Sequence, residues 1–153
     1  MKESRNQNSI GTASLRQVHV VCGVFSRTTA AGVFEVALFR RNDEYGRFEF
    51  PGGKVDPGET EPQALVRELK EELNLDVELA GFLGENTHDY ATVRIFLRAY
   101  WVRAADWTGL HLTDHSEWRW ASANEAGDLA EADVPLWELI FQKGARPKVE
   151  VAP

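Results

Sequence analysis

The pattern of apolar and polar positions predicts a mixed α/β domain. Residues 17–25 form a β-branched, apolar run that is typical of a central strand buried on both faces. Residues 93–101 alternate apolar with polar side chains, which indicates a long, half-buried strand. Shorter strands are expected at residues 33–41, 48–50, 77–83 and 118–120.

The strongest helix pattern covers residues 61–73. Thr60 and Gln63 have the spacing of a capping box, and Pro62 lies in the first turn. Asn74 is expected to end the helix, because asparagine tolerates the left-handed conformation found after a C-cap. The turn-rich residues that precede this helix are expected to form a loop over residues 52–59.

Two shorter helices are expected later in the chain. Ser122 and Glu125 have the spacing of a second capping box and predict a short helix. Asp133, which precedes Pro135, is expected to open a terminal helix as its N-cap.

Length, charge and cysteine content narrow the class of protein. The 153 residues fit one domain, expected over residues 17–143 between a flexible N-terminal arm (1–16) and a C-terminal tail (144–153). The net charge of −7 argues against a protein that coats duplex DNA, which needs many cations. Cys22 has no second cysteine to pair with, and the N-terminus lacks a signal-peptide core, so we expect a cytoplasmic protein. No apolar run approaches the ~20 residues that cross a bilayer, so no membrane partner is expected.

The helix at 61–73 carries three carboxylates on one narrow face. At about 100° per residue, Glu71 lies about 60° to one side of Glu68 and Glu72 about 40° to the other. A solvated surface is the plain interpretation, but only Arg67 and Lys70 on this helix can offset the charge. Carboxylates and the carbonyls of a glycine-rich loop are the oxygen ligands that Mg²⁺ accepts alongside substrate phosphates. The pattern therefore also fits a divalent-cation site.

The same residues resemble the Nudix box. Gly53 is followed after five residues by Glu59 and, after seven more, by residues 67–75 (Arg-Glu-Leu-Lys-Glu-Glu-Leu-Asn-Leu). Every specified position of the family pattern matches except Asn74, where the family has glycine. Because asparagine is the next best residue at a left-handed C-cap, this departure affects the helix end more than the chemistry.

The resemblance implies a Nudix fold, which is an α/β/α sandwich with a mixed β-sheet and the box as a loop–helix–loop. It implies hydrolysis of a nucleoside diphosphate linked to another group, with Mg²⁺ as cofactor, Mn²⁺ as a substitute, and two or three ions beside the substrate. The positions that resemble the metal ligands are Gly52, through its carbonyl, Glu68, Glu71 and Glu72. Glu59 and Arg67 resemble the residues that brace the box.

Residues 48–54 and 132–135 extend the resemblance to the MutT-like nucleoside triphosphate pyrophosphohydrolases. By position, Arg41 and Lys54 would contact phosphates, and Phe50 would lie near the base. Asp114 resembles an acidic loop residue that faces the metals from outside the box and accepts a proton; Glu117 and a carboxylate of the box itself, such as Glu68, are its competitors.

Asp133 has two interpretations that the sequence leaves open. It can act only as a helix cap, or it can hydrogen-bond the edge of the base, as the resemblance implies, and it can do both. An ionised Asp133 only accepts hydrogen bonds, so it would favour guanine, whose N1–H and amino group lie side by side. A guanine nucleotide is therefore the expected substrate.

Three functions follow from these expectations. The leading one is hydrolysis of a nucleoside or deoxynucleoside triphosphate to the monophosphate and pyrophosphate. The second is removal of pyrophosphate from RNA 5′ ends, with a basic track among Arg94, Arg98, Arg103 and Arg119. The third is a nucleotide sensor without catalysis, which the complete carboxylate set argues against. The sequence leaves a homodimer open.

Overall fold

The apolar run at residues 17–25 becomes the axis of the sheet. The computed structural model describes residues 14–148, and in it β1 spans Arg16–Thr28. The first part of β1 pairs in parallel with β6 (Val93–Ala104) and antiparallel with β4 (Gly52–Lys54). Its end pairs antiparallel with β2 (Phe34–Arg41). One strand thus joins the two halves of the sheet.

The other strands extend the sheet at both edges. Two pair with β2, namely β3 (Phe48–Glu49) and β7 (His115–Ala121). At the opposite edge β5 (Val77–Asp89) pairs antiparallel with β6. The order of the seven-stranded sheet is β3-β2-β1-β6-β5, with β4 on β1 and β7 on β2.

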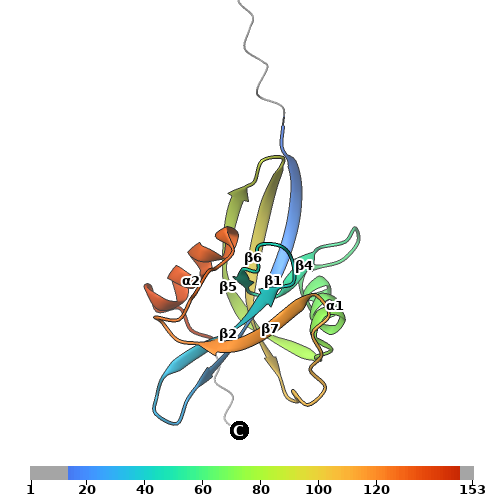
Figure 1. Ribbon diagram of the computed structural model, residues 1–153. Helices are drawn as coiled ribbons and strands as arrows, with labels where there is room; N and C mark the ends of the chain where they lie inside the picture. The colour runs from blue at the N-terminus through green and yellow to red at the C-terminus, as the bar shows by residue number, and fades with distance from the viewer. Residues whose placement is uncertain (1–13, 149–153) are drawn as a thin grey trace, which may run out of the picture.

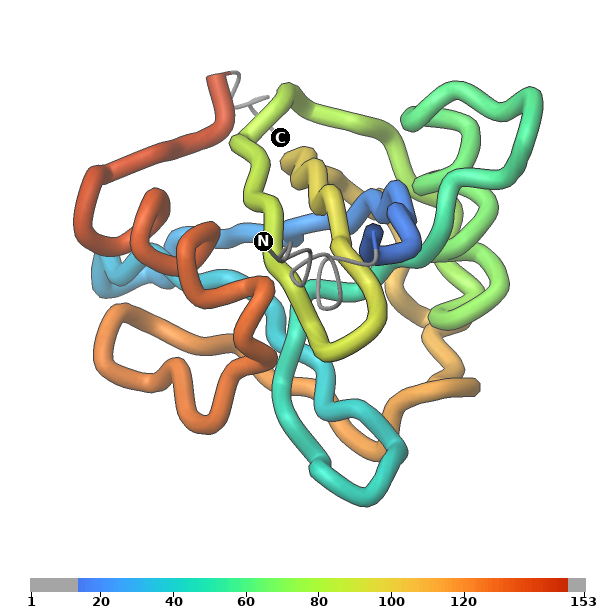
Figure 2. The backbone as a smooth tube through the Cα atoms, turned by 90° about the horizontal axis from the view of Figure 1, so that it is seen from above, coloured from blue at the N-terminus to red at the C-terminus, as the bar shows by residue number. Residues whose placement is uncertain are grey.

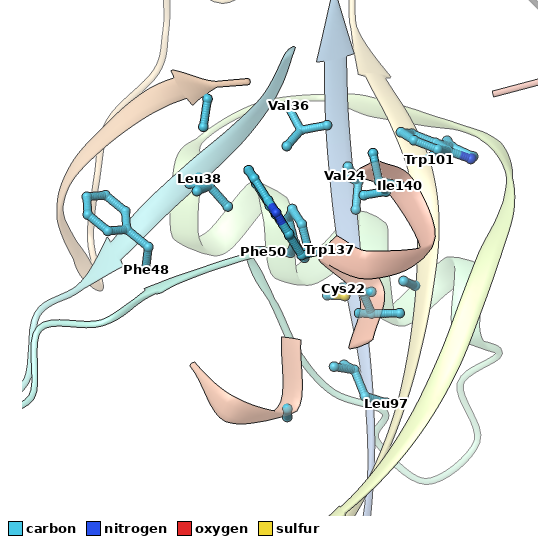
Figure 3. Packing of buried hydrophobic residues seen from close by; sticks show 14 residues of the cluster. Cys22, Val24, Val36, Leu38, Phe48, Phe50, Leu97, Trp101, Trp137 and Ile140 are labelled. Atoms are coloured by element: carbon cyan, nitrogen blue, oxygen red, sulfur yellow. The ribbon is translucent and has the colours of Figure 1, made fainter. Parts of the chain in front are cut away.

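Two helices cover opposite faces of this sheet (Figures 1 and 2). On one face α1 (Glu61–Leu73) buries an apolar stripe of Ala64, Leu65, Leu69 and Leu73. On the other, α2 (Val134–Phe141) follows a single 3₁₀ turn, η2 (Glu131–Asp133), and points Trp137 and Ile140 toward the strands (Figure 3). The predicted α/β/α sandwich with a mixed sheet is confirmed. Among the described residues, neither helix is long and apolar enough to span a bilayer.

The predicted boundaries of α1 are confirmed, with its caps. The Thr60 side chain accepts a hydrogen bond from the backbone N–H of Gln63 (3.2 Å), and the Gln63 side chain accepts one from the N–H of Thr60 (2.9 Å). Asn74 takes the left-handed conformation with φ 56° and ψ 36°, and its N–H donates to the carbonyl of Lys70. All of these contacts are local, which is why the sequence predicts them well.

The short helix predicted after Ser122 does not form, whereas the predicted terminal helix does, since α2 begins at Val134 with Asp133 at its N-cap position. Ser122 does bind Glu125, but its hydroxyl donates to that carboxylate instead of accepting from a backbone N–H, and the chain forms a turn without a helix. Asp133 precedes α2, yet its side chain caps nothing. It lies in η2 and turns inward, where it accepts a hydrogen bond from the N–H of Phe50.

Three segments are more ordered than expected. Residues 52–54 of the predicted loop form β4, because β1 offers its backbone as a pairing partner. The strand expected at 77–83 continues to Asp89, because β6 pairs with it as far as Arg94. In the predicted tail, Arg146 donates to the carbonyl of Ile140 and lies over the ring of Phe34. The predicted arm falls outside the described residues up to position 13, and Arg16 already belongs to β1.

Candidate active site

A cavity of about 960 Å³ opens between β1, the β2–β3 connection, the β5–β6 turn and η2. Its lining contains five of the predicted site residues, which are Arg41, Phe50, Gly52, Asp114 and Asp133. These residues come from four separate stretches of the chain and meet only through the fold. A cavity of this volume is large enough for a small-molecule ligand such as a nucleotide.

Beside the cavity, Arg67 of α1 ties the predicted box together. Its Nε and Nη2 donate to the two carboxylate oxygens of Glu59 at 2.6 and 2.8 Å. Nη2 also donates to the carbonyl of Lys54, and Nη1 donates to Glu68 at 3.0 Å. The bidentate contact between Arg67 and Glu59 lowers the pKa of Glu59 to about 2, mainly through the hydrogen bonds that Arg67 donates. The loop before α1 and the acidic face of α1 are therefore held by one guanidinium.

The three helix carboxylates differ in environment. The side chain of Glu71 is 59 % exposed and its described contacts are with Arg67. Glu68 is 16 % exposed and lies against Gly53, where a β-carbon would overlap its carboxylate. Glu72 is 10 % exposed, and its Oε2 is buried without a hydrogen-bond partner in the described part of the chain. The acidic face that looks uniform in the sequence thus runs from solvent to the interior.

Burial raises the pKa of Glu72 to about 9, and the negative charges of Glu49, Glu68 and Asp114 act in the same direction. Four carboxylates from α1, β3 and the β6–β7 connection therefore lie close enough to repel one another, and within residues 14–148 no lysine or arginine pairs with Glu72. Like charges gathered in this way favour binding of a cation. The orphaned Glu72 oxygen and the all-oxygen donor set fit a hard divalent ion.

Within residues 14–148, no three histidine, cysteine, aspartate or glutamate side chains already surround a common point suited to an ion. The carboxylates therefore form an open site instead of a closed cage. Mg²⁺ is commonly held in proteins by one or two carboxylates together with waters and substrate phosphates, so an open arrangement agrees with that cation.

The two candidate loop acids point to different places. Asp114 lines the cavity, and its carbonyl accepts a hydrogen bond from the N–H of Asn42 at 3.1 Å. Glu117 pairs with Arg40 at 3.5 Å, outside the cavity lining. Only Asp114 is therefore placed beside the acidic cluster.

Asp133 forms part of the cavity wall and is 5 % exposed. Its Oδ2 accepts a hydrogen bond from the N–H of Phe50 at 3.3 Å. Burial raises the pKa of Asp133 well above its usual value, and the charge of Glu49 adds to this effect while Arg41 opposes it. The side chain is thus turned toward the cavity with one oxygen already engaged.

Of the two residues predicted to contact phosphates, only one lines the cavity. Arg41 lines the cavity and places its Nε 3.0 Å from Oδ2 of Asp43. Lys54 is exposed on β4 and lies outside the cavity lining, although its backbone carbonyl accepts a hydrogen bond from Arg67.

Sequence reasoning missed Glu49 and His115. His115 Nε2 lies 2.8 Å from Oε2 of Glu49, and its Nδ1 lies 4.0 Å from Oε2 of Glu72. A signal was present for Glu49, since strand alternation places it opposite its two apolar neighbours in the sequence. No comparable signal exists for His115, because its partners are 66 and 43 positions away along the chain.

Comparison with known proteins identifies the family of this chain. The family model of the NUDIX domain matches residues 15–142. The chain is 34% identical over 140 residues to a CTP pyrophosphohydrolase of Escherichia coli, covering 87% of this chain and 98% of that protein. It is 36% identical over 129 residues to an 8-oxo-dGTP diphosphatase of Haemophilus influenzae, covering 82% and 93%. The solution structure of the E. coli ORF135 protein superposes with a TM-score of 0.70 at 30% identity, covering 88% and 96%.

The loop–helix–loop with its acidic face, the α/β/α sandwich that carries it, and the match over most of the chain point to one assignment. The chain belongs to the Nudix hydrolase family, in its MutT-like branch, and is an enzyme that acts on phosphoric anhydride bonds.

Proposed function

We propose that this enzyme hydrolyses a nucleoside or deoxynucleoside triphosphate to the nucleoside monophosphate and pyrophosphate. The observation that carries the proposal is the convergence of Glu49, Glu68, Glu72 and Asp114 next to a nucleotide-sized cavity. The names of two relatives, a CTP pyrophosphohydrolase and an 8-oxo-dGTP diphosphatase, support a nucleotide as the substrate.

Mg²⁺ is the proposed cofactor, with Mn²⁺ as a substitute and two or three ions beside the bound substrate. Glu68, Glu71, Glu72 and the carbonyl of Gly52 are the residues that would hold them. The chemistry that such ions supply is neutralisation of the phosphate charge and a lower pKa of the attacking water. The protein itself fixes the carboxylates through Arg67 and offers Asp114 as an acceptor for the water's proton.

Asp133 is the proposed reader of the base. When ionised it only accepts hydrogen bonds, which favours the two adjacent donors of guanine. When neutral it offers a donor and an acceptor, which can pair with the edge of any base. Since burial favours the neutral form, the preference for guanine should be stronger at high pH than at low pH.

Processing of RNA 5′ ends is the alternative function, and it needs a basic track. Three of the four arginines that could form one are engaged elsewhere. Arg94 pairs with Asp89, and Arg98 pairs with Glu61 and Glu85. Arg119 donates to a backbone carbonyl and lies over the ring of Phe48. The free nucleotide is therefore the better supported substrate. The cytoplasmic location and the homodimer stay predictions from the sequence.

One panel of substrates tests the proposal. The catalytic efficiency would be measured for the eight common ribo- and deoxyribonucleoside triphosphates and for a 5′-triphosphate RNA, with Mg²⁺ or Mn²⁺. We expect turnover of free nucleotides, led by guanine. A strong preference for the RNA would favour the alternative, and no turnover of any of these would refute the proposed activity.

The same panel with Asp133→Ala over a series of pH values tests whether Asp133 selects the base. The wild-type preference for guanine should strengthen as the pH rises, and the variant should lose this preference at every pH. An unchanged ranking in the variant would show that Asp133 does not select the base.

A further inference from the structure

His115 lies between two carboxylates that come from different elements. Its Nε2 is 2.8 Å from Oε2 of Glu49 on β3, and its Nδ1 is 4.0 Å from Oε2 of Glu72 on α1. The imidazole side chain is 1 % exposed. Among the described residues, Nδ1 of His115 and Oε2 of Glu72 are the two buried side-chain atoms without a hydrogen-bond partner.

Two backbone hydrogen bonds hold the segment that precedes His115, one to α1 and one to the end of β2. The N–H of Thr113 donates to the carbonyl of Glu72 at 3.1 Å, which attaches the β6–β7 connection to the end of α1. The N–H of Asn42 donates to the carbonyl of Asp114, which attaches the same connection to the end of β2. The ring also packs against Phe39, with ring centroids 5.6 Å apart. The imidazole therefore has little freedom to move.

The contact with Glu49 determines which ring nitrogen carries a proton. A carboxylate only accepts hydrogen bonds, so Nε2 must be the donor at 2.8 Å. A histidine that donates one ring nitrogen to a carboxylate has a fixed orientation, and its other nitrogen is aimed at a fixed point. Here that nitrogen is aimed at Glu72.

We propose that His115 is a positioning residue for this reaction, which holds Glu49 through Nε2 and, through its fixed ring, limits where the carboxylate of Glu72 can lie, 4.0 Å from Nδ1. The inference rests on the proposed function, because Glu72 is a proposed ion ligand. His115 then keeps carboxylates of β3 and α1 at a fixed separation before any ligand binds. Groups that orient ligands in this way change ion affinity or activity by about 10–100-fold when they are removed.

Three variants separate the two contacts of the ring. His115→Gln retains an N–H close to the position of Nε2, and His115→Asn retains a polar group close to the position of Nδ1. His115→Phe keeps the ring packing on Phe39 and removes both contacts. His111→Phe is the matched control, because His111 lies in the same β6–β7 connection and is exposed.

Two quantities are measured for each variant, the affinity for Mn²⁺ without nucleotide, by calorimetry, and kcat and KM for the best nucleotide. We expect His115→Phe to lose about 10-fold or more in Mn²⁺ affinity and in kcat, with KM changed less than about threefold. His115→Gln and His115→Asn should each recover part of the loss, and His111→Phe should match the wild type. Wild-type Mn²⁺ affinity and kcat in His115→Phe would overturn the proposal.

A measurement on the unmodified protein guards against variants that fold poorly. The long-range ¹H–¹⁵N spectrum of the imidazole rings reports which nitrogen of His115 is protonated. We expect the proton on Nε2; a ring without a proton on Nε2 would overturn the proposal. If the wild type hydrolyses no nucleotide, the proposed function fails, while the Mn²⁺ affinities and the spectrum still decide the role of His115.

Discussion

Glu72 combines burial with three negative neighbours, and both effects favour its protonated form. A carboxylate in this position destabilises the ion-free protein and becomes useful only when a cation is bound. The same side chain should therefore be costly for folding and essential for catalysis. Such an exchange of stability for activity is common where polar groups are held ready for a ligand.

Replacement of Glu72 by glutamine separates these two roles. The proposed ligand is lost, so kcat should fall by about 100-fold or more, while the shape of the side chain is kept. Glu71→Gln is an informative comparison, because Glu71 is largely exposed and contacts Arg67. Turnover of Glu72→Gln within a few-fold of the wild type would remove Glu72 from the ion site.

The pKa of Glu72 also predicts how the stability of the ion-free protein depends on pH. The folded-state pKa of about 9 lies above the unfolded value of 4.5, so the folded protein binds more protons between these pH values. Its stability contribution is present below pH 4.5 and is lost as the pH rises through 9. In EDTA, the wild-type Tm should fall between pH 6 and pH 9 more steeply than that of Glu72→Gln. Parallel curves for the two proteins would contradict the assigned pKa.

Asp114 and Glu117 provide a second test at single residues. Asp114 lines the cavity, whereas Glu117 pairs with Arg40 outside it. We expect Asp114→Asn to lower kcat by about 10-fold or more and Glu117→Gln to leave it within about twofold. The reverse order, measured under the same conditions, would assign the proton acceptor to Glu117. Two small effects would place it within the box.

At the scale of elements, α1 is the best predicted part of the fold. Its capping box, its proline and its left-handed end all depend on residues within a few positions of one another. β1 and β6 are predicted for a similar reason, since their apolar patterns are long. The continuation of β5 to Asp89 was missed because it depends on pairing with β6, which the local pattern does not contain. The failed cap at Ser122 has a local cause, because its hydroxyl donates to the carboxylate of Glu125 three residues away.

The candidate site likewise contains residues that the local sequence predicts and residues that depend on distant partners. Its residues within the box could be predicted because their spacing along one loop and helix is fixed. His115 and the inward turn of Asp133 could not, because each depends on a partner more than 40 positions away, and the contact of Glu49 with His115 is equally distant along the chain. Long-range packing also decides that Lys54 lies outside the cavity while Arg41 lies within its lining.

Asn74, where the family pattern has glycine, joins the end of α1 to the β6–β7 connection. It takes a left-handed conformation, and its Nδ2 donates to the carbonyl of Gly109 at 3.0 Å. Asn74→Ala should destabilise the protein by about 1–2 kcal/mol, from strain at positive φ and loss of this bond. Asn74→Gly keeps the backbone conformation and should cost less. Denaturant unfolding measures both, and an equal cost for the two variants would refute the role of the backbone conformation.

At the scale of the whole molecule, the sandwich holds groups from distant segments around one cavity. α1, β3 and the β6–β7 connection supply the acidic cluster, while Asp133 of η2 and Phe50, which directly follows β3, form another part of the cavity wall. A ligand that bridges these elements stabilises only the folded state. Mg²⁺ together with a nucleotide should therefore raise the Tm, by an amount that grows with ligand concentration, and should do so less in Glu72→Gln. Equal shifts in both proteins would place the ligand away from the acidic cluster.

The central claim is that the acidic cluster directs hydrolysis of a nucleoside triphosphate to the monophosphate and pyrophosphate. Its most direct test is ³¹P NMR of the products formed from dGTP and Mg²⁺ by the wild type and by Glu72→Gln at equal concentration. We expect equal amounts of nucleoside monophosphate and pyrophosphate from the wild type and very little product from the variant. Release of inorganic phosphate with a diphosphate, or equal rates for the two proteins, would contradict it.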